Sequence, residues 1–399
     1  MPLRHPRALP TVLDARVVTG SGGGPDKTIL NSPRFLQPLG YRMLCGYLTP
    51  PGDPGFAVLE RQAAKAGAPL IAIPDRGPAD WRIVPKLLKI CRDENVAVWH
   101  GHDYKTNALG LLLNRFWPMR LVTTLHGWVK RTARTPLYYR IDRLCLRHYE
   151  RVFCVSDDLF AAARRSGVAA RRCVLLENGI DTGEYARRRS TAEAKLALGF
   201  PPDEFLIGAV GRLSPEKGFD ILLRSVKSLR DRGANVRLLL VGEGDDRTRL
   251  EALTAELGLR DVVQFAGWQS NTKPYFEAMD VFALSSLREG LPNVLLEAMA
   301  LGVPCVATRI AGVPKLIEHD VSGWLVEPGD AESLADGISR LVGHSDLSSR
   351  YADAARRTIT ERYDFSRRTT RLADAYDELL ARGGSASGQP HDRAETRPR

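Results

Sequence analysis

The sequence predicts an α/β protein made of two doubly wound units, each with its own parallel sheet. Short apolar strands alternate with amphipathic helices, which is the pattern of parallel α/β sheets. The pattern stops in a polar, charge-rich segment that runs from a turn at Glu177–Asp181 to about Pro202, and it restarts at Phe205. The length of 399 residues suits two or three domains, and 44% hydrophobic residues let each half bury a core.

In the first half, short apolar runs bounded by turn residues predict the strands. A glycine-rich turn, Thr19–Lys27, follows the first strand and leads into a helix from about Thr28. Trp81–Asn95 is predicted to be a helix because its apolar residues recur mostly on one helical face. The predicted strands are Val12–Val18, Arg42–Tyr47, Leu70–Ile73, Val96–Trp99, Leu121–Leu125, Val152–Val155 and Cys173–Leu176.

The second half repeats the alternation and then ends in helices, predicted at Ala331–Val342, Ser348–Arg362 and Phe365–Arg382. From residue 383 the chain has almost nothing to bury, so the tail 383–399 is expected to be disordered. The predicted strands are Phe205–Val210, Val236–Val241, Val262–Phe265, Val281–Leu284, Pro304–Ala307 and Gly323–Val326.

Composition narrows the classes of function. The 57 Lys and Arg against 47 Asp and Glu leave a net charge of +10, which suits a nucleic acid, an anionic membrane surface or a phosphorylated small molecule. No apolar run approaches the roughly 20 residues that cross a bilayer, and the opening residues lack the apolar core of a signal peptide. The 6 cysteines form no Cys-x-x-Cys pair. A cytoplasmic protein without a zinc or redox site is therefore expected.

Ligand binding is expected at the carboxyl ends of the strands, as in other open parallel sheets. Arg212 and Lys217 follow the strand Phe205–Val210, beside the start of the next helix. Helix N-termini favour anions, and an Arg fork with a Lys point charge suits a diphosphate. The alternative is a pair of solvated surface cations.

A second cluster follows the strand Val281–Leu284. Glu289 precedes a predicted helix that runs from Pro292 to about Leu301, and Glu297 lies within that helix. The two carboxylates can accept hydrogen bonds from different parts of an extended ligand, while free N–H groups at the helix start can bind phosphate oxygens. Judged alone, an acidic helix residue such as Glu297 more often has a structural role.

Three further candidates lie in the first half. The loop 19–27 matches neither the G-x-G-x-x-G nor the GK[ST] pattern, but its backbone can approach a phosphate or sugar; a plain turn is the alternative. His126 ends the strand Leu121–Leu125 and suits hydrogen bonding or proton transfer. His100 and His102 follow another strand end, and no third ligand at a recognisable spacing supports a metal site there.

The chain also carries motifs that identify a family. In order, they are GGGPDK, HGHDYKTN, TLHG, VSDDL, ENGID, GRLSPEKGFDILL, VGEGDD, VQFAGW, EGLPNVLLEAMALGVPCVAT and AGVPKLIEHDVSGWLVEPGD. The set resembles family 4 glycosyltransferases, which are retaining, nucleotide-sugar-dependent enzymes of the GT-B fold. The resemblance implies an acceptor-binding domain over 1–180, a nucleotide-sugar-binding domain over 181–363, and a helix 364–382 that packs back on the first domain.

The resemblance implies a role for each candidate residue. Arg212 and Lys217 match the pair that neutralises the donor diphosphate. Glu289 and Glu297 match the E-x7-E pair, of which the first faces the donor sugar and the second the ribose. His126 matches a histidine near the transferred sugar. Loop contacts to the donor are implied for Gly23, Gly24, Gly242, Glu243, Gly290, Leu291, Pro292 and Asn293.

The reaction expected of such an enzyme needs no divalent metal and no other cofactor. The two cations and the helix N–H groups would offset the charge that the leaving diphosphate gains in the transition state. The acceptor is expected to be a glycan, a lipid-linked molecule or a small molecule, with His102, Asp103 and Lys105 on its side of the site. Retention leaves two routes open: a covalent intermediate on Glu289, or same-face attack with the departing phosphate as base.

Two other functions are alternatives. A nucleotide-sugar epimerase of the same fold would need a separate set of acidic and histidine groups, which the sequence does not show. A non-catalytic polyanion-binding protein, such as a nucleic-acid binder, would show a basic face with interleaved aromatic residues. Carboxylates accompany Arg212 and Lys217 instead. A hexosyltransferase that does not bind nucleic acid is therefore expected.

Most of the surplus charge lies in one stretch of the first half. Residues 115–175 hold 13 Lys and Arg but only 4 Asp and Glu. Within them, Pro136–Glu150 predicts an amphipathic helix with Leu137, Ile141, Leu144 and Cys145 at helical spacing beside arginines. This helix is expected either to meet an anionic membrane or a lipid-linked acceptor, at the inner membrane face, or to pack its apolar stripe on the sheet.

Overall fold

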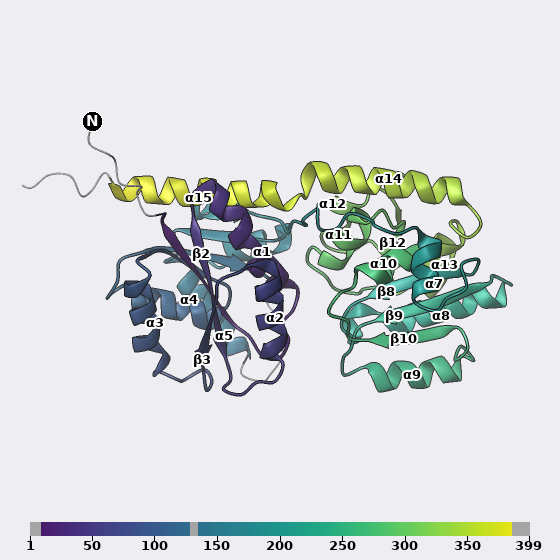
Figure 1. Ribbon diagram of the computed structural model, residues 1–399, viewed down its shortest axis with the longest axis horizontal. Coiled ribbons are helices and arrows are strands. Elements are labelled where there is room, and N and C mark those ends of the chain that lie inside the picture. Colours follow the sequence, from purple (N-terminus) through teal and green to yellow (C-terminus); the bar gives the residue numbers. More distant parts are fainter. Residues whose placement is uncertain (1–8, 128–134, 385–399) are drawn as a thin grey trace, which may run out of the picture. The chain divides into compact units, whose positions relative to one another are not determined.

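The structure is a computed structural model that describes residues 9–127 and 135–384. Contacts divide the chain into two compact units (Figure 1). The first unit takes the chain up to Cys154, Phe160–Leu176 and the chain from Thr369, and the second takes Val155–Leu159 and Glu177–Arg368.

The first unit contains a seven-stranded sheet in the order β3-β2-β1-β4-β5-β6-β7, with every pair of neighbours parallel. The chain moves outward on one side of β1 and then returns to the other side at β4. The sheet is therefore doubly wound, and its topological switch point lies between β1 and β4. The strands are β1 (Thr11–Val17), β2 (Arg42–Thr49), β3 (Leu70–Pro74), β4 (Val96–Gly101), β5 (Arg120–Leu125), β6 (Arg151–Cys154) and β7 (Cys173–Leu175).

Amphipathic helices cover this sheet. The final helix, α15 (Phe365–Gly384), packs Leu372 and Tyr376 into one apolar cluster with Val12 and Val98 of the sheet. The chain thus returns to the first unit after passing through the second. The other helices are α1 (Gly24–Leu36), α2 (Phe56–Ala66), α3 (Ile83–Asp93), α4 (Tyr104–Leu113), α5 (Thr135–Leu146) and α6 (Asp157–Arg165).

The second unit contains a six-stranded sheet in the order β10-β9-β8-β11-β12-β13, again with parallel neighbours. Its switch point lies between β8 and β11, so the loops after these two strands frame the expected ligand position. The strands are β8 (Phe205–Val210), β9 (Val236–Val241), β10 (Val263–Gly267), β11 (Val281–Leu284), β12 (Cys305–Thr308) and β13 (Trp324–Val326).

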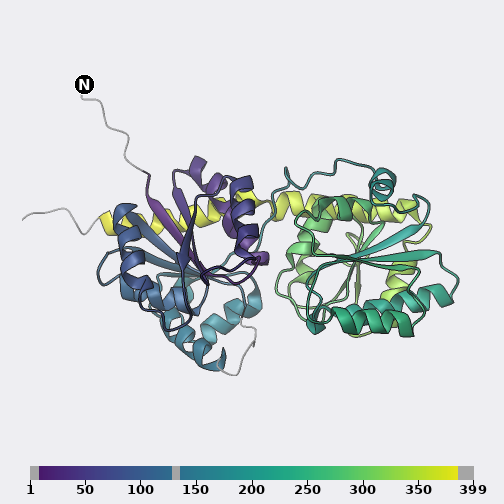
Figure 2. The same cartoon turned by 60° about the horizontal axis from the view of Figure 1, so that its bottom comes forward.

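Two apolar clusters form the core of the second unit. One gathers residues such as Leu295 and Ile359, and the other gathers residues such as Leu222 and Ile338. Figure 2 shows the strands of each unit with helices on both sides. The helices of this unit are α7 (Thr191–Ala197), α8 (Phe219–Asp231), α9 (Arg247–Glu256), α10 (Lys273–Ala278), α11 (Asn293–Ala300), α12 (Val313–Leu316), α13 (Ala331–Ser339) and α14 (Ser345–Arg362).

Three local predictions need correction. The glycine-rich turn is shorter than expected, because α1 already begins at Gly24, where Pro25 loses no hydrogen bond in the first turn. The polar segment before Pro202 contains α7, capped by the Ser190 hydroxyl, which accepts from the Glu193 amide at 3.3 Å. Helix α15 extends to Gly384, and the rest of the predicted disordered tail lies outside the described residues.

A helix that crosses a membrane must be long and apolar enough to span the bilayer. In the part of the chain that the structure describes, no helix combines the length and the apolar character that a membrane crossing requires.

Candidate active site

The loops after β8 and β11 are locked together at the switch point of the second unit. Gly218 has a φ of +61°, and a Cβ there would lie 2.3 Å from the Ser285 carbonyl oxygen. The Ser285 hydroxyl donates to the Lys217 carbonyl at 3.0 Å, and the Leu287 amide donates to the Glu216 carbonyl at 2.8 Å. Only glycine allows this close approach, which carries Lys217 to the end of β11.

Lys217 and Glu289, which lie 72 residues apart in the chain, form the central pair of this site. The Lys217 Nζ lies 2.6 Å from the Glu289 Oε1, with side-chain exposures of 20% and 10%. The Ser286 hydroxyl donates to the same carboxylate oxygen at 2.7 Å. An ammonium group is thus held in place, partly shielded from water, where the strand ends point.

Arg212 supplies the second cation at the same strand end. Its Nη2 lies 2.6 Å from the Glu216 Oε1, and its side chain is 56% exposed. Partial burial raises the pKa of Glu216, but hydrogen bonds from the backbone and from Arg212 outweigh this effect and lower it overall. Glu216 therefore stays ionised near neutral pH and holds Arg212 beside the loop.

Glu297 is buried in α11, at 2% exposure. The Thr272 hydroxyl lies 3.3 Å from its Oε2 and donates to it. Burial, the charge of Glu297 and a hydrogen bond to it raise the pKa of Tyr185. The Glu297 carboxylate thus lies beside Thr272 and Tyr185, two neighbours that the sequence alone did not predict. Its contact with a ribose stays a prediction.

The loop after β9 packs edge to edge with the loop after β8. Gly242 has a φ of +145°, and a Cβ there would lie 1.9 Å from the Gly211 carbonyl oxygen. The Gly242 amide donates to Gly267 at 2.9 Å, and the Leu213 amide donates to the Glu243 carbonyl at 3.0 Å. The Glu243 side chain pairs with Arg247 at the rim of this site.

Backbone contacts fix the segment 290–293, which was expected to bind the donor. The Gly312 amide donates to the Gly290 carbonyl at 3.1 Å, and the Asn178 side chain donates to the Leu291 carbonyl at 3.3 Å. Pro292 caps α11, so Asn293 begins the helix. The carbonyls of this loop are held by the scaffold, and its N–H groups lie at the helix start.

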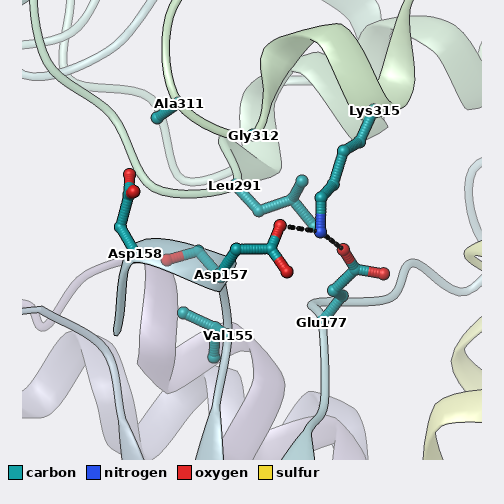
Figure 3. Close-up of a pocket in the computed structure, with 9 residues that line it drawn as sticks. Val155, Asp157, Asp158, Glu177, Leu291, Ala311, Gly312 and Lys315 are labelled. Carbon is teal, nitrogen blue, oxygen red and sulfur yellow. Dashed lines mark hydrogen bonds and ion pairs between the residues drawn. The ribbon is translucent and has the colours of Figure 1, made fainter. Parts of the chain in front are cut away.

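A pocket next to Leu291 contains charged residues to which the sequence analysis gave no role (Figure 3). The Lys315 Nζ contacts Asp157 and lies 2.9 Å from the Glu177 Oε1. Burial lowers the pKa of Lys315, but these two carboxylates outweigh that effect and raise it. The lining residues, all in the second unit, are Val155, Ser156, Asp157, Asp158, Glu177, Leu291, Ala311, Gly312 and Lys315.

In the first unit, carboxylates hold the glycine-rich loop at the end of β1. The Gly20 amide donates to the Asp53 Oδ2 and the Gly23 amide to the Asp26 Oδ2, both at 2.6 Å. Asp26 is buried and also pairs with the Arg16 Nε at 2.7 Å. The Gly23 amide, expected to meet the donor, thus already has a partner within the loop, whereas the predicted donor contact of Gly24 stays a prediction.

The predicted histidines meet at the carboxyl ends of β4 and β5. The His102 Nδ1 and the His126 Nε2 lie 2.8 Å apart, and the two rings stack with centroids 5.1 Å apart. The other ring nitrogen of His102 contacts the carboxylate of Asp14, which lies in the middle of β1. An acidic residue in the middle of a predicted strand was the sequence signal that could have identified Asp14.

The fold brings a third potential metal ligand, Asp14, beside two histidines, which the sequence did not show. Asp14, His100 and His102 bring their potential ligand atoms within 4.8 Å of one another. However, the two ring nitrogens of His100 each lie 2.7 Å from a hydroxyl, that of Tyr376 and that of Thr124. We interpret this cluster as a buried hydrogen-bond network because its ring nitrogens already have protein partners.

Asp103 and Lys105 were assigned to the acceptor side, which stays a prediction, and the structure gives both side chains partners within the first unit. Asp103 caps α4, accepting from the Lys105 and Thr106 amides at 3.0 Å, and it also accepts from Val17. Burial raises the pKa of Asp103. The Lys105 Nζ is buried 2.6 Å from the Asp75 carboxylate. Both charged groups therefore serve the scaffold, and His102 alone of the three stays near His126.

Comparisons with known proteins agree with this arrangement. A family model described as Glycosyltransferase Family 4 matches residues 22–184, and one described as Glycosyl transferases group 1 matches residues 190–358. The chain is 37% identical over 268 residues to LpsE, a lipopolysaccharide core biosynthesis glycosyltransferase of Rhizobium meliloti strain 1021. The aligned region covers 64% of this chain and 75% of LpsE. It is 32% identical over 307 residues to a D-inositol 3-phosphate glycosyltransferase of Saccharomonospora viridis, covering 71% and 70% of the two chains.

Solved structures show the same two-sheet architecture. HepE of Anabaena, crystallised with UDP-glucose, superposes with a TM-score of 0.79 at 22% identity, over 92% of this chain and 100% of that chain. Sucrose-phosphate synthase from Thermosynechococcus elongatus gives 0.78 at 21% identity, over 94% and 100%. These likenesses establish the GT-B fold. The family models and the curated relatives show that the chain belongs to the family 4 glycosyltransferases.

Proposed function

We propose that this glycosyltransferase moves a hexosyl unit from a UDP- or GDP-linked sugar to an acceptor hydroxyl, with retention of the anomeric configuration. The observation that carries the proposal is the Lys217–Glu289 pair, 2.6 Å apart at the switch point, with Arg212 at the same strand end. A sugar diphosphate needs cations for its phosphates and a hydrogen-bond acceptor for its hydroxyls, and this site offers both within one unit.

The two cations would act mainly on the leaving group. When the glycosidic bond to the diphosphate breaks, negative charge grows on the departing phosphate oxygen. A preorganised ammonium and guanidinium stabilise this charge more in the transition state than in the bound donor. We propose on this basis that the reaction needs no divalent metal.

The surroundings of Glu289 favour same-face attack over a covalent intermediate. The Glu289 Oε1 accepts hydrogen bonds from both the Lys217 ammonium and the Ser286 hydroxyl. A carboxylate stabilised by an ion pair and a hydrogen bond is a weaker nucleophile. In the proposed route, the departing phosphate takes the proton of the attacking hydroxyl, and Glu289 orients Lys217 and the donor sugar.

The acceptor is proposed from the curated relatives. LpsE and LpsD of Rhizobium meliloti, at 37% and 35% identity, are both described as lipopolysaccharide core biosynthesis glycosyltransferases. We therefore propose a glycan or glycolipid acceptor, such as a growing lipopolysaccharide core, over the free small molecules that other relatives use.

A thermal-shift panel of UDP, GDP and their sugars tests the donor. A nucleotide present at 100 times its Kd should stabilise the native protein by about 2.7 kcal/mol, a rise in Tm of about 5–10 °C for a unit of this size. The rise should be the same with EDTA as with Mg²⁺. A panel without any shift above about 1 °C contradicts the donor site, and a shift that requires the metal contradicts the metal-free mechanism. Sugar-nucleotide turnover without acceptor would instead favour the epimerase alternative.

The exposure of the amphipathic helix α5 bears on the two expectations for the basic stretch. Leu137, Ile141 and Leu144 are 57%, 40% and 58% exposed, so these three members of the apolar stripe do not pack on the sheet, whereas the fourth, Cys145, is buried. The buried face carries Asp142, whose Oδ1 accepts from the Asn107 amide at 2.7 Å, and Cys145. This buried hydrogen bond sets the roll of the helix and turns the leucines outward.

Arginines surround this exposed stripe. Arg140 and Arg143 are exposed on α5, and Arg147 is exposed directly after its end. The Arg147 Nε donates to the Ser166 carbonyl at 2.8 Å, and the Arg172 Nη1 donates to the Arg147 carbonyl at 2.7 Å, which joins α5 to further arginines after α6. We propose that this surface binds the anionic inner face of a membrane, with the apolar residues entering the headgroup region.

Sedimentation with lipid vesicles tests this surface. The protein should bind phosphatidylglycerol vesicles at low salt, and phosphatidylcholine vesicles at least tenfold more weakly. Changing Leu137, Ile141 and Leu144 together to Gln should weaken binding at least tenfold, because each leucine-sized side chain loses up to about 2 kcal/mol of apolar burial. The matched control is Leu196→Gln, which changes a leucine that is 62% exposed in the second unit. Equal binding by the triple variant and the control, or no binding by the wild type, contradicts the proposal.

A further inference from the structure

A buried carboxylate lies behind His126, the histidine expected near the transferred sugar. Asp14 is 3% exposed in the middle of β1, where an ionised group needs strong partners. The His102 Nε2 contacts the Asp14 Oδ1, and the His102 Nδ1 lies 2.8 Å from the His126 Nε2. The three side chains form a continuous path from the interior of the sheet to the carboxyl end of β5.

The order of the strands creates this path. Strand β4 pairs with β1 on one side and with β5 on the other, and Asp14 is the register partner of His100 on β4. The three strands that contribute the path are therefore direct neighbours, and β1 and β4 flank the switch point of this sheet.

Stacking restrains the histidine rings. The His102 ring stacks on His126 at 20° and on His100 at 15°, with centroids 5.1 Å and 4.6 Å apart. His100 is in turn held between the Tyr376 hydroxyl of α15 and the Thr124 hydroxyl of β5. His102 therefore cannot rotate without breaking contacts on both of its faces.

The chain of contacts also selects a tautomer for each histidine. A carboxylate only accepts hydrogen bonds, so the hydrogen of a neutral His102 lies on Nε2, next to Asp14. Its Nδ1 then accepts, and the partner across the 2.8 Å contact, the His126 Nε2, donates. The hydrogen of a neutral His126 therefore lies on Nε2.

We propose that Asp14 and His102 are positioning residues for glycosyl transfer, which fix the orientation of the His126 ring through its Nε2 and hold it in the Nε2–H tautomer. This inference rests on the proposed function, because it takes His126 to face the transferred sugar. A third group that orients a catalytic histidine is a general device of enzyme sites.

A double-mutant cycle tests the coupling. Asp14→Asn keeps the size of the side chain and lets an amide donate to His102, which permits the opposite tautomers. We expect kcat to fall at least tenfold while the KM of the donor changes less than threefold. In a His126→Ala background, Asp14→Asn should change kcat less than twofold, because the path no longer ends on a histidine. The proposal is overturned if the losses of kcat in Asp14→Asn and His126→Ala multiply in the double variant, or if Asp14→Asn alone keeps the wild-type kcat.

Tyr149→Phe is the matched control. It removes a buried hydroxyl of the same unit, which donates to the Asn107 carbonyl at 2.8 Å, and it changes none of Asp14, His100, His102 and His126. It should keep kcat within twofold of the wild type. A tenfold loss in this control would show that the activity follows general damage to the first unit, which also overturns the proposal.

A second measurement does not depend on activity. NMR of the full chain labelled with ¹⁵N-histidine, at mildly alkaline pH where an ordinary histidine is neutral, should show His102 and His126 as Nε2–H tautomers. His126→Gln and His102→Gln assign the signals. An Nδ1–H tautomer at His126 overturns the inference even if Asp14→Asn does not fold. Absence of transfer from every donor would instead count against the proposed function and leave the tautomer result standing.

Discussion

Lys217→Ala should lower kcat at least tenfold, equivalent to about 1.4 kcal/mol of transition-state stabilisation. The Lys217 Nζ lies 2.6 Å from the Glu289 Oε1 at the switch point, so its removal deletes a preorganised cation. It also leaves the Glu289 carboxylate, 10% exposed, without its counter-ion and facing the incoming phosphates. Arg212→Ala should act in the same direction. Steady-state kinetics with a donor from the thermal-shift panel measures both effects.

Lys227→Ala is the control for this prediction. Lys227 lies on α8 of the same unit, its side chain is 39% exposed, and it pairs with Asp231 one turn away. Its loss therefore removes an equal charge outside the site. We expect kcat within twofold of the wild type in this variant. Unchanged kinetics in both Lys217→Ala and Arg212→Ala would refute the phosphate assignment.

Gly242→Ala should cause the largest loss of stability among the single changes considered. Its φ of +145° lies where side chains are strained, and its Cβ would lie 1.9 Å from the Gly211 carbonyl oxygen, a backbone atom that cannot rotate away. The loops after β8 and β9 must then separate. We expect a loss of about 2–4 kcal/mol, combining strain and overpacking, and a loss of the thermal shift with the donor nucleotide.

Gly233→Ala separates backbone strain from the steric contact with Gly211 as causes of the lost stability. Gly233 has a φ of +83°, but nothing lies within 4 Å of the Cβ that would be added. This variant therefore measures backbone strain alone, about 1 kcal/mol. Thermal unfolding should show a drop in Tm at least twice as large for Gly242→Ala as for Gly233→Ala, with nucleotide binding retained only in the latter. Equal drops would show that the contact with Gly211 does not matter.

The strands were predictable because buried parallel strands are nearly continuous apolar runs. The bounds of β8, β9 and β11 agree with those predicted from the sequence. The start of α1 was not predicted, because it depends on the Asp26 carboxylate accepting from the Gly23 amide, a contact inside the glycine-rich loop. A rule based on local apolar periodicity does not include such a contact.

The candidate site was only partly predictable. Residue types at strand ends identified Arg212 and Lys217, but the pairing of Lys217 with Glu289 depends on β11 lying beside β8. The scaffold contacts of Asp103 and Lys105 were not predicted, because a charged residue after a strand looks the same in sequence whether it caps a helix or meets a ligand. Burial distinguishes the two cases, and burial is a property of the fold.

The sequence by itself determined the alternation of strands and helices, the restart of the pattern in the second unit and the family. Each of these follows from local periodicity or from short motifs. Only the tertiary structure decided which distant groups meet: Asp14 with His102 across the first sheet, and the outward turn of Leu137 on α5. Strand order and helix roll are set by packing between segments far apart in the chain, and for that reason no local pattern determined them.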